Sequence, residues 1–195
     1  HMQIELKALH RSLGCVDVST GQWDGKAYRS VVMEKPLDQS LLREHLRTLA
    51  RYNRWATREL FAHVDTVPDA DYRRDAGLFF KSIHGTLNHL LVAEHALWRR
   101  RFAEGVSPRL ALDAELESDR ARLRDALLEG AACWQPLIES WPEDRFEGAL
   151  EYTSTQGVAM RLPFAAALAH VFNHGTHHRG QITAAITALG RPCPE

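Results

Sequence analysis

The sequence has few cysteines and no long apolar run. Its three cysteines are scattered over 195 residues, and none forms a C-x-x-C pair: Cys15, Cys133 and Cys193. An odd, scattered set does not build a disulfide framework, so we expect reduced thiols in a cytoplasmic protein. No apolar stretch approaches the ~18 residues of a membrane span, and no charged start before an apolar core marks a secretory signal. We therefore expect no membrane partner.

An excess of charge of either sign is also missing. Lysine and arginine number 24 against 25 aspartates and glutamates, which gives a formal net charge of −1. No whole-molecule basic field is available to hold nucleic acid, so we expect no nucleic-acid partner. Local arginine clusters at residues 99–101 and 120–124 carry no pattern of a nucleic-acid module, and we interpret them as solvated helix faces. The sequence also contains no P-loop, no G-x-G-x-x-G and no Ser-His-Asp arrangement.

The first 36 residues differ from the rest of the chain. Residues 15–20 alternate apolar and polar positions, residues 21–25 are turn-forming, and residues 27–33 are again strand-forming. This pattern predicts an N-terminal hairpin-like appendage. A second interpretation makes Met33 the natural start of the protein. We divide the chain into a tag remnant (1–2), the appendage (3–36), a main domain (37–190) and a C-terminal tail (191–195).

Apolar residues recur every three to four positions over most of the main domain. This period predicts four long helices, which run from residue 37 to just before Pro68, over about 80–104, over about 112–139, and over about 163–189. Pro136 is expected to kink the last turn of the third helix. Residues 146–162 change to a strand-like period around a turn and predict a short hairpin. The expected fold class is all-α, a four-helix bundle with a short β-hairpin before its last helix.

Eleven histidines are the one compositional surplus, and four of them lie within nine residues of the last predicted helix. Positions four apart on a helix differ by about 40° in azimuth, so His170, His174 and His178 form a ladder with His177 at its edge. Two imidazoles at i and i+4 can bind one metal ion. In a histidine-rich chain the spacing alone is a weak signal, but four histidines so close together are unusual.

The second predicted helix carries a matching histidine, His89. Small or polar residues share its face and the face of His174, where a plain core would have leucine and isoleucine: Gly85, Thr86, Ala93, Ala96, Ala167, Gln181 and Ala185. We interpret these stripes as room for an ion, water and substrate. The alternative is that His89 is an ordinary core histidine. His84 and His95 are interpreted as packing or surface residues, and His45 is a spare candidate.

Three neutral imidazoles without an obvious fourth protein ligand predict an open coordination position, which is typical of catalytic metal sites. A metal ion there would acidify bound water or hold a thiol as thiolate. Glu94 projects to one side of His89 and is either an outer partner of the site or a surface residue.

Several segments resemble the motifs of the DinB family of bacterial proteins. Residues 173–181 read N-H-G-T-H-H-R-G-Q, which closely resembles the family's N-H-x-T-H-H-R-G-Q signature. Residues 82–91 resemble its second-helix motif, and residues 52–56, Y-N-R-W-A, its first-helix motif. Residues 148–157 are similar to its strand pair, and the likeness covers about residues 38–190.

The resemblance implies a homodimeric four-helix bundle with one divalent metal ion, zinc, nickel or iron, on three histidines. These correspond here to His89, His174 and His178, and His170 and His177 are our reserve ligands. Glu94 stands where relatives commonly carry aspartate. Characterised relatives include thiol-dependent S-transferases and a maleylpyruvate isomerase that uses a low-molecular-weight thiol. The expression of some members is linked to DNA damage.

We therefore expect a metal-dependent enzyme, a transferase that activates a small thiol and adds it to an electrophilic small-molecule substrate. One alternative is a metal-dependent hydrolase that uses bound hydroxide. The other is a non-enzymatic, metal-binding stress-response protein whose bundle serves dimerisation or partner binding.

Overall fold

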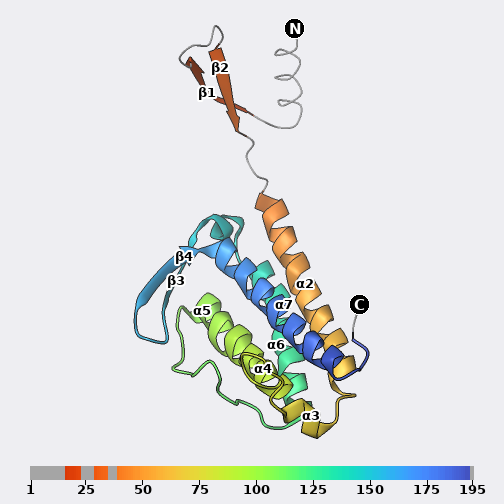
Figure 1. Cartoon of the computed structure of the whole chain (residues 1–195). Helices are drawn as coiled ribbons and strands as arrows, with labels where there is room; N and C mark the ends of the chain where they lie inside the picture. Colours follow the sequence, from red (N-terminus) through yellow and green to blue (C-terminus); the bar gives the residue numbers. More distant parts are fainter. Residues whose placement is uncertain (1–15, 23–28, 35–38, 194–195) are drawn as a thin grey trace. The chain divides into compact units, whose positions relative to one another are not determined.

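The computed structural model describes residues 16–22, 29–34 and 39–193, and the chain divides into two units, His1–Leu42 and Arg43–Glu195. In the first unit, β1 (Val16–Gln22) pairs antiparallel with β2 (Arg29–Glu34) (Figure 1). Gln22 lies opposite Arg29, and the register shifts between Asp17 and Ser19. The predicted N-terminal hairpin is thus confirmed, whereas Cys15 and the turn between the strands lie outside the described residues.

The second unit is a bundle of four long helical segments (Figure 1). The first is α2 (Gln39–Val64), which begins four residues before this unit. The second is a continuous segment of α4 (Ile83–Leu90), η1 (Leu91–Trp98) and α5 (Arg99–Glu104). The third and fourth are α6 (Arg120–Ser140) and α7 (Phe164–Ala188). A short α3 (Asp69–Arg73) and a 3-10 turn, η2 (Glu143–Glu147), lie in the connections. The bundle confirms the predicted fold class. No helix in the described part of the chain is long and apolar enough to cross a membrane.

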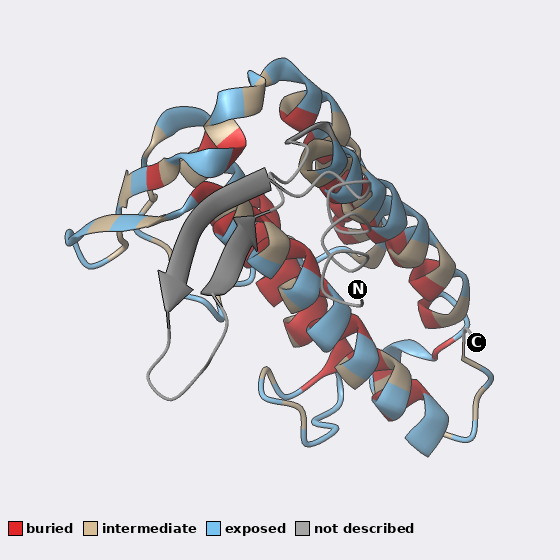
Figure 2. Ribbon diagram, turned by 90° about the horizontal axis from the view of Figure 1, so that it is seen from above, coloured by how far each residue is buried: buried red, intermediate tan, exposed pale blue. Residues whose placement is uncertain are grey.

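Two clusters of buried side chains hold α4 and α5 against α7. One cluster contains Leu87 of α4 and Ile182 of α7, and both are fully buried. The other is aromatic, with the ring of Phe102 in α5 lying 5.0 Å from that of Phe164 in α7. Figure 2 shows buried residues along the inner sides of these helices. Because the two clusters lie at opposite ends of the pair, they fix the register of the residues between them.

The hairpin before α7 was also predicted. β3 (Ala149–Thr153) pairs antiparallel with β4 (Ala159–Pro163), and Leu150 is buried opposite Leu162. Its turn contains Gly157 at φ +82°, a conformation that glycine adopts without steric cost. The Thr153 amide donates to the carbonyl of Gly105, just after α5. The hairpin is therefore attached to the end of the second helical segment.

The boundaries of two helices differ from the sequence prediction. The third helix begins at Arg120, not near residue 112, because Asp119 caps it by accepting a hydrogen bond from the Arg122 amide. The second begins at Ile83, not near residue 80, because Ser82 is its N-cap and Lys81 has a left-handed backbone at φ +67°. Helix α6 continues through Pro136 to Ser140. Residues 91–98 form a π-helix that the sequence pattern did not indicate.

Candidate metal centre

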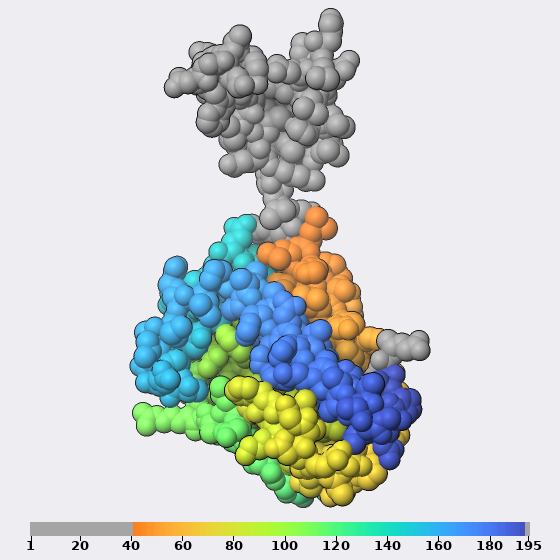
Figure 3. Space-filling view, viewed as in Figure 1, coloured from red at the N-terminus to blue at the C-terminus, as the bar shows by residue number. Residues whose placement is uncertain are grey.

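Three imidazoles converge between α4 and α7. The surfaces of these two segments, yellow and blue, adjoin in Figure 3. The Nε2 atom of His174 lies 3.2 Å from Nε2 of His89 and 3.1 Å from Nε2 of His178. One ligand atom from each ring lies within 4.8 Å of the others. His174 and His178 are one helical turn apart on α7, whereas His89 comes from α4, so the packing of the two helices closes the group. These are the three histidines that the sequence analysis selected.

The outer hydrogen bonds of two rings determine where their protons lie. His89 Nδ1 is 2.7 Å from the carbonyl oxygen of Leu112, and His178 Nδ1 is 2.8 Å from Oε1 of Gln181. Both partners are acceptors, so both Nδ1 atoms must donate and both Nε2 atoms carry a lone pair. Metal-binding histidines are usually oriented in this way.

The third ring, His174, cannot donate to both of these nitrogens. A neutral His174 has one ring proton, so its Nε2 can donate to only one of the two facing lone pairs. Its Nδ1 is buried and has no hydrogen-bond partner among the described residues. With the proton on Nε2, one of the two facing lone pairs stays without a donor; with the proton on Nδ1, the His174 lone pair faces both others at about 3 Å. A cation between the three nitrogens would relieve either arrangement. The donor set consists of imidazole nitrogens, which suit zinc, nickel and iron alike.

The electrostatics keep the three rings neutral, the form in which they bind metal. Burial, together with the smaller effects of the nearby His178 and His89 rings, lowers the pKa of His174 to about 3. Burial also lowers the pKa of His178 to about 4, against the effect of its hydrogen bond to Gln181, and it lowers the pKa of His89. At neutral pH the site therefore needs to release no imidazolium proton before it binds a cation.

Phe80 fixes the His89 ring from one side. The two rings stack with centroids 3.7 Å apart at 14°, and Phe80 also contacts His178 at 5.7 Å. Gly85 makes this loop position possible, because a Cβ at residue 85 would lie 2.2 Å from the Phe80 carbonyl oxygen. The small residue thus makes room for the backbone, not for a substrate as the sequence analysis expected.

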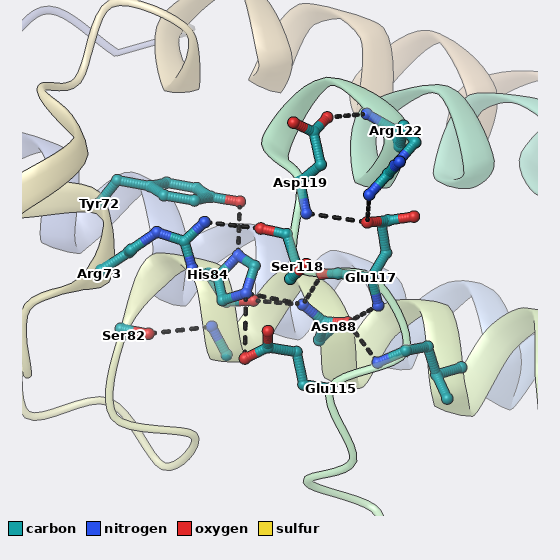
Figure 4. A network of polar contacts seen from close by, with 12 residues as sticks. Tyr72, Arg73, Ser82, His84, Asn88, Glu115, Glu117, Ser118, Asp119 and Arg122 are labelled. Atoms are coloured by element: carbon teal, nitrogen blue, oxygen red, sulfur yellow. Dashed lines mark hydrogen bonds and ion pairs between the residues drawn. The ribbon is translucent and has the colours of Figure 1, made fainter.

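A polar network holds the loop that carries the Leu112 carbonyl (Figure 4). Asn88, next to His89 on α4, accepts hydrogen bonds from the amides of Leu116 and Glu117 through Oδ1. Its Nδ2 donates to the Glu117 carbonyl at 2.9 Å. The same helix therefore supplies one ligand and anchors the loop whose carbonyl orients that ligand.

Glu94 does not join the three histidines. It is fully buried in η1 and accepts a hydrogen bond from Asn53 of α2, which in turn accepts one from Arg179 of α7. Burial raises the pKa of Glu94 to about 7, although the Arg179 charge and the Asn53 hydrogen bond act in the opposite direction. This network ties three helices together behind the site, so the alternative of a surface residue is wrong.

The other histidines in the described part of the chain stay outside the cluster. The reserve ligands His170 and His177 are exposed on α7, and His45 is exposed on α2. His84 and His95 are buried, as packing residues, and His84 bonds to the Tyr72 hydroxyl. Sequence reasoning missed Phe80 and the Leu112 carbonyl as parts of the site. Phe80 lies before the start of α4, so the helical periodicity does not place it. Every residue has a backbone carbonyl, so the residue type of Leu112 gives no indication of this contact.

A helical bundle with three converging imidazoles on two of its helices defines a class of candidate metal-binding proteins. The sequence matches the DinB family profile over residues 33–195, so the chain belongs to the DinB family. It is similar to Protein DinB of Bacillus subtilis (strain 168), with 27% identity over 148 residues that cover 73% of this chain and 84% of that protein.

Proposed function

We propose that this protein is a divalent-metal-dependent transferase that joins a small thiol to an electrophilic carbon. The observation that carries the proposal is the convergence of three neutral imidazoles with no fourth histidine, cysteine or carboxylate among the described residues. Structural metal sites commonly close the coordination sphere with four protein ligands, whereas catalytic sites keep a position open. A divalent cation held here would lower the pKa of a small thiol at that position and so favour its thiolate.

The chain's own residues support this role in three ways. The neutral rings leave the positive charge of the cation uncompensated, which favours an anionic sulfur. The hydrogen bonds to Leu112 and Gln181 hold two rings in their binding tautomer. The described cysteines, Cys133 and Cys193, are absent from the ligand group, so the reacting thiol would come from solution. In the reaction the thiolate sulfur forms a bond to carbon, and the displaced leaving group takes the electron pair of the broken bond.

The test is to incubate metal-loaded protein with a panel of electrophiles, with and without a panel of bacterial thiols, and to follow conjugates by mass spectrometry. We expect metal-dependent conjugation that is lost in His178→Ala and kept in His177→Ala, because His177 is exposed and outside the cluster. Turnover of esters or amides without thiol would favour the hydrolase instead. Silence in both assays would favour a non-enzymatic metal-binding protein.

A further inference from the structure

Arg101 of α5 is held between two aromatic rings. Its guanidinium carbon lies 4.5 Å from the ring centroid of Trp98 and 4.6 Å from that of Tyr152. Its Nε donates a hydrogen bond to Ser107 Oγ at 2.9 Å. Residues from η1, from the loop after α5 and from β3 therefore hold one guanidinium in place.

This guanidinium lacks an anionic partner in the described part of the chain. The adjacent Arg100 pairs with Glu104 at 2.8 Å, and Arg43 pairs with Glu143 at 2.8 Å, but no ion pair involves Arg101. Neither of its terminal nitrogens has a hydrogen-bond partner among these residues, and neither is sealed from solvent. Burial lowers the pKa of Arg101, which reflects partial loss of water around the charge. A preorganised, partly desolvated guanidinium fork is suited to a bidentate bond with a carboxylate.

Arg101 is connected to the metal-site histidines by a row of aromatic rings. Trp98 lies 5.5 Å from His170, and His170 lies 5.9 Å from His174, centroid to centroid. His170 is exposed on α7, one turn before His174. Each of the three steps from Arg101 to His174 is thus between 4.5 and 5.9 Å. An elongated small molecule can span three such steps.

We infer that Arg101 binds the carboxylate of the small molecule whose thiol occupies the open position at His89, His174 and His178. The inference rests on the proposed function and narrows the cosubstrate to a carboxylate-bearing thiol. The Trp98 ring, which contacts both Arg101 and His170, would contact the apolar middle of the ligand. A purely structural role, in which Arg101 only stacks on Trp98 and Tyr152, would leave its terminal nitrogens unused.

The experiment compares thiols that differ in a single group. Protein loaded with cobalt(II) is titrated with ω-mercaptocarboxylic acids of increasing chain length and with the matching ω-mercaptoamides, and binding is followed by the visible absorption of the metal. At the best length we expect the acid to bind about tenfold tighter than the amide or more, since charge-assisted hydrogen bonds are lost in the amide. The preference should vanish in Arg101→Met and persist in Arg100→Met, the matched control whose partner is Glu104.

Other outcomes separate this inference from the proposed function. Equal affinity for acid and amide in the native protein, or a preference that survives Arg101→Met, would overturn the role of Arg101. A parallel series with hydroxamate in place of thiol covers the case in which no thiol binds. If the hydroxamates show a carboxylate preference that depends on Arg101, thiol transfer is rejected but carboxylate binding by Arg101 is kept. If they show no preference, both the proposed function and the role of Arg101 are rejected. If Arg101→Met does not fold, Arg101→Lys, which keeps the charge without the fork, must show a reduced preference.

Discussion

The orientation of two of the three imidazoles, His89 and His178, is set by groups that do not themselves belong to the ligand set. Gln181 accepts a hydrogen bond from His178, Leu112 accepts one from His89, and Phe80 stacks on the His89 ring. Removal of such partners usually lowers metal affinity without abolishing binding, because the ligand remains but its ring is free to turn. The side chain of Gln181 is the partner that a single substitution removes most cleanly.

We predict that Gln181→Ala weakens metal binding about 10- to 100-fold, because His178 then loses its orienting acceptor. The affinity is measured by competition with a chromophoric chelator. Gln156→Ala is the control, since Gln156 is exposed in the hairpin turn and its recorded hydrogen bond comes from its backbone amide. An unchanged affinity in Gln181→Ala would show that this hydrogen bond does not hold the ligand.

Glu94 predicts a pH effect on stability. Its pKa rises from 4.5 to about 7 on folding, so its contribution to stability is fully present below pH 4.5 and is lost as the pH rises through 7. Glutamine in its place is always neutral. On going from pH 5 to pH 8, the metal-free native protein should therefore lose on the order of 3 kcal/mol of unfolding free energy relative to Glu94→Gln. Denaturant unfolding at both pH values measures the difference, and a constant gap would mean that Arg179 keeps Glu94 ionised throughout.

At the scale of the helix, two glycines of α7 are a matched pair. A Cβ on Gly175 would lie 2.3 Å from Oε1 of Glu94 and 3.0 Å from Oδ1 of Asn53, whereas a Cβ on Gly180 would meet nothing within 4 Å. Gly175→Ala should therefore destabilise the protein by about 1–3 kcal/mol, because the buried network must move. Gly180→Ala should stabilise it by about 0.5–1 kcal/mol through helix propensity. Thermal unfolding measures both, and equal effects would contradict the close packing at Gly175.

The helical period predicted the four long segments, and the change to a strand-like period predicted the hairpin before α7, but neither pattern indicated where the loops begin. Leu112 and Leu116 continue the apolar period of the third helix, yet both are exposed and belong to a loop. Asn88 holds this segment as a loop, because its Oδ1 accepts hydrogen bonds from the Leu116 and Glu117 amides. Asn88 lies on α4, which is distant from the loop in sequence. Such a non-local contact has no signature in a window of residues. The Ser82 cap was a local signal and could have been found.

The convergence of the three histidines was predictable, because i and i+4 spacing on one helix is a local property, and the small-residue face of the second helix and the family motif indicated the third residue, His89. The buried chain from Asn53 through Glu94 to Arg179 was not, since its members lie on three separate helices. Only the packing of α2, η1 and α7 brings them together. Residue type and period thus identify candidate ligands, whereas the supporting contacts depend on the assembled bundle.

For the whole molecule, the division into two units gives a prediction about truncation. All three histidines lie in the unit Arg43–Glu195, and the family match begins at residue 33. Deletion of residues 1–32 should therefore leave a bundle that melts cooperatively and binds the same amount of metal as the full chain. Calorimetry and metal analysis of the truncated protein check this. An insoluble product or a broad, non-cooperative transition would show that the first residues belong to the bundle core.

The central claim is that His89, His174 and His178 together hold one divalent ion, and metal content tests it most directly. Elemental analysis of the purified native protein, of His174→Ala and of His177→Ala, each saturated with the same metal and desalted, compares a ligand with its exposed neighbour. His174 contacts both other ligands through Nε2, so its loss should empty the site. The account predicts about one ion per chain in the native protein and in His177→Ala, and almost none in His174→Ala. Full occupancy in His174→Ala would contradict it.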